Sequence, residues 1–436
     1  MWNQPTLVTG SCTDLWAELR AKLDQPRLER ACRAAFYGPY RSRVATRPDA
    51  RWAQVGGIEQ VGGNACRLPD PLAARTILAL QENDQARAWT NLLALTKLVA
   101  GWHPLPFEED VLYWHNVNLV RAFGVTWQAL QARTLTEAQL ATLQREWESA
   151  DFRSGLPEVA ALARAEIEAE YREQARRPLP PFRFRYMLSP QDGWRRLTAW
   201  ATEARLRRDM LQDEDALLQL FLHREEGYRR VQACSTWREI RTMPGVRKPP
   251  LGIANLLPLA TNRVPTPPSL MSARASSLSS VYARYRFAFE PFMAGSLWRM
   301  ADSESMRRLL VTALALERYR LGHDSYPASL DGLTPELLPG QPLDFMDGAP
   351  LRYRHMQDGR FVLYSTGLDC IDDGGIARRP DLLWANSGHD HTDLVWPCAA
   401  SQAETAAEAA SRRQSPQVVT TRRTFVPDRS VMAHKE

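Results

Sequence analysis

Apolar residues recur every three or four positions through most of the segment Asp14–Tyr186. This spacing puts them on one face of an α-helix. Thr136 is an expected N-cap, because its side chain can accept a backbone N–H at the start of an amphipathic run. Over this segment and its continuation to Cys234, the pattern predicts helices at Thr76–Gln81, Ala86–Val99, Glu108–Leu130, Thr136–Asp151, Pro157–Arg176 and Ser189–Cys234, the last interrupted near Asp213.

A proline-rich stretch follows this helical region. From Pro244 to Pro268 there are seven prolines in 25 residues. Each proline removes a backbone donor and clashes with the preceding helical turn, so a long helix is excluded here. We expect an extended connection packed across the helices, or else a linker. Helical spacing then returns at Ser277–Met300 and Glu304–Leu321.

The pattern changes from helix to strand after residue 325. Leu351–Arg354 and Arg360–Ser365 are predicted strands, and Asp358-Gly359 between them is a strong hairpin signal. The last segment, Ser401–Glu436, has few large apolar residues and is expected to be disordered.

Together these patterns predict a mainly α protein. The expected architecture is a helical body, built as a bundle or an irregular solenoid, followed by a small α+β domain with an antiparallel sheet. The expected divisions are a helical body at 1–243, a Pro-rich connection at 244–270, a helical joining segment at 271–303, the α+β domain at 304–400 and a disordered tail at 401–436.

The region Met306–Trp396 carries several short motifs in a specific order. They are Leu314-Ala315-Leu316-Glu317-Arg318-Tyr319-Arg320, Tyr326-Pro327, Ser329-Leu330, Pro342-Leu343-Asp344, Asp347-Gly348, Leu351–Arg354, Phe361–Ser365, Thr366-Gly367-Leu368-Asp369 and Asp393-Leu394-Val395-Trp396. In this combination the region resembles the globular part of a type II secretion pseudopilin, a pilin-like subunit of bacterial envelope machines. The resemblance implies a helix spine, a proline-rich crossing loop, a small antiparallel sheet and an aspartate-bearing calcium loop.

The rest of the chain departs from that family. The prepilin cleavage site and apolar N-terminal helix of pseudopilins are not found after Met1, and largely helical sequence precedes the resembling region. The whole arrangement resembles bacterial envelope proteins with a long helical body and a pseudopilin-like C-terminus. This implies a periplasmic or envelope-associated location, with a membrane anchor expected upstream of Met1. The chain itself has no run of about 18 apolar residues that would predict a transmembrane segment.

An acidic cluster is the main candidate for ligand binding. Asp369, Asp372 and Asp373 are followed by Gly374-Gly375. Calcium takes about six to eight oxygen ligands on flexible backbone, and closely spaced carboxylates beside glycine can surround it. The resemblance adds Asp393 to this set. The alternative is an ordinary turn held by the aspartates' own hydrogen bonds, without a cation.

A second motif could bind a transition metal. His389, His391 and Asp393 form the pattern HxHxD, and two imidazoles at this spacing can bind zinc. Hydrolases that use this motif need a further histidine directly after the aspartate, where Leu394 stands. We therefore expect adventitious metal binding rather than a hydrolase centre.

Other catalytic patterns are missing from the sequence. It contains no Gly-x-Ser-x-Gly elbow, P-loop or dinucleotide fingerprint. The pairs Glu108-Glu109 and Glu225-Glu226 are interpreted as solvated helix faces. Four tryptophans could line a groove that stacks sugars or peptides, although core packing explains them as well. They are Trp89, Trp102, Trp114 and Trp127.

The composition of the chain limits the classes of partner that it can be expected to bind. The 436 residues include 55 basic and 50 acidic side chains, which gives a net charge of +5, and 44% of the residues are hydrophobic. This near-balance predicts a folded protein and no nucleic-acid partner. The six cysteines include no CxxC pair. They are expected to be buried thiols, with a Cys370–Cys398 disulfide as the alternative in an oxidising compartment.

The sequence therefore favours a non-enzymatic cell-envelope scaffold or interaction protein, with unidentified protein partners and a calcium-stabilised C-terminal domain. One alternative is a hydrolase that acts on an envelope polymer through a cleft in the helical body. Another is a cytoplasmic helical adaptor whose C-terminal resemblance is only one of fold.

Overall fold

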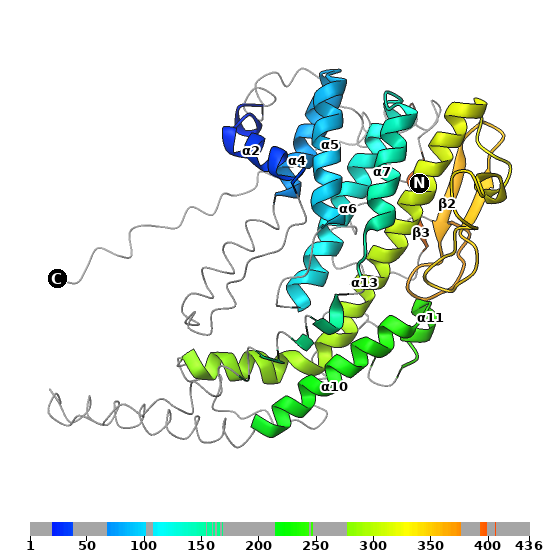
Figure 1. The fold of residues 1–436 in the computed structure, drawn as a ribbon. Helices are drawn as coiled ribbons and strands as arrows, with labels where there is room; N and C mark the ends of the chain where they lie inside the picture. Colours follow the sequence, from blue (N-terminus) through cyan, green and yellow to red (C-terminus); the bar gives the residue numbers. More distant parts are fainter. Residues whose placement is uncertain are drawn as a thin grey trace, which may run out of the picture.

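The computed structural model describes residues 20–37, 68–101, 108–153, 214–243, 246, 277–375, 393–398 and 406, together with 155–158, 160–161, 164–165 and 168. Three helices are described by their backbone alone over 108–114, 214–224 apart from Leu222, and 277–296. In Figure 1, α6 and α7 lie beside one long helix, α13, with α4 and α5 packed on their far side, and a small sheet covers the other side of α13. The described part is mainly α with a small antiparallel sheet, as predicted.

The helices follow the hydrophobic pattern closely. Their bounds are α2 Pro26–Ala34, α4 Pro69–Gln81, α5 Gln85–Ala100, α6 Glu108–Gln131, α7 Glu137–Ser149, α10 Glu214–Ala233, α11 Trp237–Ile240 and α13 Ser277–His323, with a short 3-10 turn, η4, at Leu330–Leu333. The predicted cap of α7 is confirmed. The Thr136 side chain accepts the backbone N–H of Gln139, and the Gln139 side chain accepts the N–H of Thr136.

The prediction of separate helices at 277–300 and 304–321 is wrong, because α13 runs through both without a break. Asp302 and Ser303, which lie between the two predicted helices, are buried. Asn116 of α6 donates to the Ser303 hydroxyl at 3.4 Å. Packing against α6 therefore accommodates polar residues within the helix. Figure 1 shows α13 changing direction in its N-terminal half, which contains Pro291 and Gly295.

One apolar core joins the helices to the sheet. It includes Leu92 of α5, Leu119 of α6, Leu143 of α7, Leu314 of α13 and Leu363 of the sheet, all of them buried. Burying each such leucine contributes roughly 1.5–3 kcal/mol. The division of the chain at residue 304 stays a prediction, although that position lies inside α13 and this core contains residues from both sides of it.

The sheet has the order β1-β2-β3 and is antiparallel throughout. Its strands are β1 Arg352–His355, β2 Phe361–Ser365 and β3 Leu394–Val395. The predicted hairpin turn is confirmed, since Gly359 has a φ of +78° and donates its N–H to Met356 O at 3.0 Å. Ser365 pairs with Leu394. This antiparallel register brings the start of β3 to the loop that follows β2.

A second, smaller core attaches α10 and α11 to the same end of the sheet. Trp237 and Ile240 of α11 pack with Phe345, Met346 and Leu368. The backbone N–H of Trp237 donates to Phe345 O at 2.8 Å. This contact could not be expected from sequence spacing, because more than a hundred residues separate its two sides.

Several predictions fall wholly or partly outside the described residues. They concern residues 189–213, nearly all of the Pro-rich connection and of the tail 401–436, and the side chains of Trp102, Trp114, His389 and His391. Of the other two proposed groove tryptophans, Trp127 is buried and donates its indole N–H to Pro397 O at 2.6 Å, while Trp89 is half-buried. None of the described helices is both long and apolar enough to cross a membrane.

Candidate functional site

Asp393 is the centre of the candidate site. It immediately precedes β3 and is fully buried. Its carboxylate accepts the backbone N–H of Gly375 at 2.7 Å and that of Asp373 at 3.1 and 3.3 Å to its two oxygens. A single side chain just before β3 therefore holds the loop that follows β2.

The loop reaches Asp393 through left-handed backbone. Cys370, Gly374 and Gly375 have φ angles of +58°, +79° and +81°. A Cβ atom at Gly375 would lie 3.0 Å from the Tyr364 ring, so both the backbone angle and the neighbouring ring require glycine there. The Gly374-Gly375 pair that suggested a flexible cation loop has this structural role.

Asp372 lies on the outer side of the loop. It accepts the Gly374 N–H at 2.9 Å and the Tyr364 hydroxyl at 3.0 Å, and the Arg352 Nε is 3.5 Å away. The Gly374 hydrogen bond, together with those from Tyr364 and Arg352, lowers the pKa of Asp372 in spite of slight burial. Burial and the Asp372 hydrogen bond raise the pKa of Tyr364 to about 12. Asp372 is therefore an anion in this structure at neutral pH.

Asp369 has a different environment. Its side chain accepts the N–H of Ile371 at 3.0 Å. Its carbonyl oxygen accepts a hydrogen bond from Arg241, which also donates to Leu368 O at 3.1 Å. Arg238 donates to the next carbonyl, that of Cys370, at 3.4 Å. Two arginines of the α11 region thus supply positive charge to this side of the loop.

The carboxylates around Asp393 repel one another. Burial raises the pKa of Asp393, and the neighbouring Asp372 and Asp373 charges raise it further, against the hydrogen bonds from Gly375 and Asp373. The Asp372 and Asp373 charges thus lie near enough to Asp393 to act on its ionisation, and a bound divalent cation would relieve this repulsion.

The calcium-ligand set of Asp369, Asp372, Asp373 and Asp393 stays a prediction. The charges of Asp372 and Asp373 act on Asp393, whereas the Asp369 side chain is engaged with its own turn. Over the described ranges, no three His, Cys, Asp or Glu side chains are already arranged to hold a metal ion. The structure thus shows a turn held by hydrogen bonds to Asp393.

Sequence reasoning missed another buried carboxylate, that of Asp344. It is fully buried beside Ser365 and accepts that residue's hydroxyl at 2.7 Å. The available signal was an aspartate directly before the apolar Phe345 and Met346. Cys370 also has a local partner, because its thiol donates to Met346 O at 3.3 Å and it is not joined to Cys398 by a disulfide.

Comparisons of the chain with protein-family models, with curated proteins and with solved structures gave no match.

Proposed function

We propose that this protein is a non-enzymatic scaffold or interaction protein of the bacterial cell envelope, with a pseudopilin-like, calcium-stabilised C-terminal unit. The observation that supports this best is the buried Asp393 before β3, whose carboxylate accepts N–H groups of the acidic loop and lies within the influence of the Asp372 and Asp373 charges, in a sheet that packs on α13. A helix spine beside a small antiparallel sheet, with an acidic loop after its second strand, is the arrangement that the resemblance implies. The helical body would offer the surface for a protein partner.

The carboxylates suit calcium for a physical reason. The Asp373 backbone already contacts the Asp393 carboxylate, the charges of Asp372 and Asp373 act on it, and hard carboxylate oxygens are the ligands that calcium prefers. A bound calcium ion would neutralise charge that burial makes unfavourable. Since the ion would bind only the folded loop, its binding free energy would add to stability.

Thermal unfolding of the full chain with calcium and with a chelator tests the ion. We expect the melting temperature to rise with calcium and to respond to magnesium much less. Asp373→Asn should abolish the response while keeping the fold, because its backbone N–H to Asp393 remains. Asp358→Asn, in the exposed hairpin turn, is the matched control and should respond like the unmodified protein. A calcium-independent melt would remove calcium from the proposal.

Fractionation of bacteria that make the natural protein tests the location. Recovery with the periplasm or the envelope is expected. Recovery in the cytosol would contradict the envelope role and favour a cytoplasmic adaptor, whatever the calcium result.

A further inference from the structure

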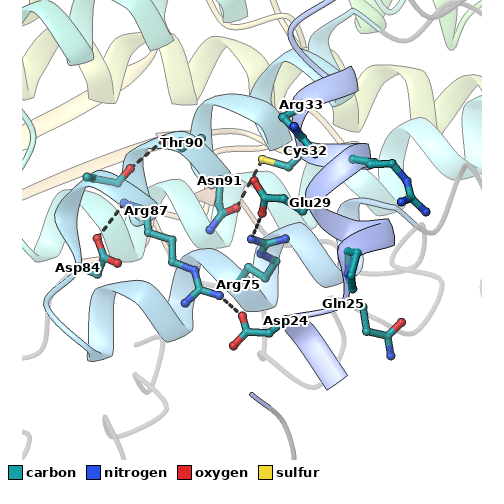
Figure 2. A pocket seen from close by; sticks show the side chains of 13 residues that line it. Asp24, Gln25, Glu29, Cys32, Arg33, Arg75, Asp84, Arg87, Thr90 and Asn91 are labelled. Atoms are coloured by element: carbon teal, nitrogen blue, oxygen red, sulfur yellow. Dashed lines mark hydrogen bonds and ion pairs between the residues drawn. The ribbon is translucent and has the colours of Figure 1, made fainter. Parts of the chain in front are cut away.

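A cavity of about 850 Å³ lies between α2, α4 and α5, far along the helical body from the acidic loop. Figure 2 shows its lining side chains, with Arg75 of α4 and Asn91 of α5 pointing toward Glu29 and Cys32 of α2. A volume of several hundred Å³ is typical of small-molecule sites.

Arg75 has fewer partners than a buried guanidinium needs. It is 5% exposed, and its Nη2 donates to Glu29 Oε2 at 2.6 Å. Its Nε and Nη1 are buried and have no hydrogen-bond partner. Unsatisfied buried donors cost about 1–3 kcal/mol each, and more when they are charged. The cost argues that Arg75 has a role beyond a single ion pair.

Asn91 repeats this feature on the same wall of the cavity. It is 1% exposed, and its Oδ1 accepts a weak hydrogen bond from the Cys32 thiol at 3.6 Å. Its Nδ2 is buried without a partner. Arg75 of α4 and Asn91 of α5 therefore both line the cavity with donor atoms that have no acceptor.

The charge of the lining favours an anion. Four arginines and three acidic residues face the cavity, which leaves one positive charge in excess. Two of the acidic residues are engaged, since Asp84 accepts the Arg87 N–H at the start of α5 and Asp24 pairs with the Arg87 side chain. Arg30 and Arg33 are exposed, and no ion pair of theirs is found among the described residues. The start of α5 adds the positive end of its dipole.

From this geometry we propose that the cavity binds a small organic oxyanion, a carboxylate or a phosphate, with Arg75 as its main contact. The Glu29 carboxylate occupies the position of that oxyanion in the structure. Its side chain is 51% exposed, so it can leave Arg75 for solvent at little cost. The incoming oxyanion would take its place on the guanidinium, and Asn91, Arg30 and Arg33 would supply further donors and charge. The inference is independent of the acidic loop and of its cation.

Thermal unfolding and calorimetric titration of the full chain test the site. Inorganic phosphate and citrate are the two probes, and sodium chloride at matched ionic strength is the reference. We expect one probe to raise the melting temperature above the chloride series and to bind with a measurable heat. The probe that acts distinguishes a phosphate site from a carboxylate site. Equal effects of both probes and chloride would overturn the proposal.

Three variants distinguish a ligand site from a structural ion pair. Arg75→Met should abolish the response to the active probe. Glu29→Gln should strengthen binding several-fold, because it removes the competing carboxylate and one negative charge. Asn91→Leu should leave the probe-free melting temperature unchanged or higher, because it replaces a buried unsatisfied amide, and should weaken the response.

The exposed Arg145 of α7 provides the control, and Arg145→Met should behave like the unmodified protein. If Arg75→Met does not fold, Glu29→Gln and Asn91→Leu still decide the question. Weaker binding in Glu29→Gln, or an unchanged response in Asn91→Leu, would overturn the assignment.

Discussion

The Arg352 guanidinium on β1 donates to the fully buried Asp344 carboxylate at 3.0 Å. The same carboxylate accepts the N–H of Met346 at 2.9 Å, the hydroxyl of Ser365 at 2.7 Å and the N–H of Thr366 at 2.9 Å. These donors lie in the segment before β1, in β1 itself, and at the end of β2. Asp344 therefore ties the segment before β1 to the end of β2, next to the acidic loop.

Asp344→Ala is expected to lower the free energy of unfolding by about 3 kcal/mol or more. The substitution leaves the Ser365 hydroxyl and the Met346 and Thr366 N–H groups without this acceptor, while Arg352 keeps Asp347. Urea unfolding followed by circular dichroism measures the change. Asp358→Ala in the exposed hairpin turn is the control and should cost less than about 1 kcal/mol. A loss that is equal in the two variants would contradict the central position of Asp344.

Glu304 of α13 gives the protein a specific acid sensitivity. It is 5% exposed and accepts hydrogen bonds from Arg307 at 2.7 and 2.8 Å and from Arg308 at 2.8 Å. Burial opposes its ionisation, but the hydrogen bonds and charges of Arg307 and Arg308 outweigh burial and hold the pKa of Glu304 below its ordinary value.

A carboxyl group with a lowered pKa in the folded state stabilises the protein above its unfolded pKa of about 4.3. This stability is lost as the pH falls through the folded value. We therefore expect the free energy of unfolding to decrease below about pH 5, and Glu304→Gln to lose about 2 kcal/mol at pH 7 with a shallower acid decline. Urea titrations at several pH values measure both. An identical acid slope in the two proteins would assign the sensitivity to other carboxylates.

Local signals in the sequence were sufficient where local chemistry decides the structure. Thr136 begins α7 because its own side chain and that of Gln139 satisfy the first N–H groups. Asp358-Gly359 makes the hairpin because glycine adopts a positive φ without strain. Neither feature depends on a distant part of the chain, so pattern alone predicts it.

Distant contacts decided what the sequence could not show. The pattern predicts a break between Met300 and Glu304, yet Asp302 and Ser303 lie inside α13, where Ser303 contacts α6. Asp369 looks equivalent to Asp372 in the acidic cluster, but Arg241 from the α11 region engages its carbonyl. Two donor atoms of Arg75 have no partner because of how α2, α4 and α5 pack around it. The spacing of residues in the sequence does not predict that packing.

Trp237 is predicted to hold α11 against the segments that flank the sheet, at Phe345 and Leu368. It is 1% exposed and its indole N–H donates to Leu368 O at 2.9 Å. Trp237→Ala should cost about 3–5 kcal/mol through the cavity it leaves, while Trp237→Phe, which keeps most of the volume, should cost about 1–2 kcal/mol. Arg238→Ala, at an exposed neighbouring position, is the control. Equal stability of the alanine variant and the control would show that α11 is not anchored by this side chain.

Thr136 and Thr142 form a matched pair for testing the start of α7. Thr136 caps the helix, whereas the half-buried Thr142 donates its hydroxyl to Ala138 O and accepts a hydrogen bond from Arg145, both within the same helix. Thr136→Ala should lower the free energy of unfolding by about 1 kcal/mol, because it exposes the first N–H groups of the helix. Thr142→Ala should be neutral or slightly stabilising, because alanine is the better helix former. Chemical denaturation of the two variants side by side measures the difference, and a larger loss at Thr142 than at Thr136 would contradict the capping box.

The same measurement tests whether the start of α7 unfolds together with the core. Because α7 packs on α13, a measurable loss from Thr136→Ala would show that this exposed turn takes part in the cooperative unfolding of the shared core.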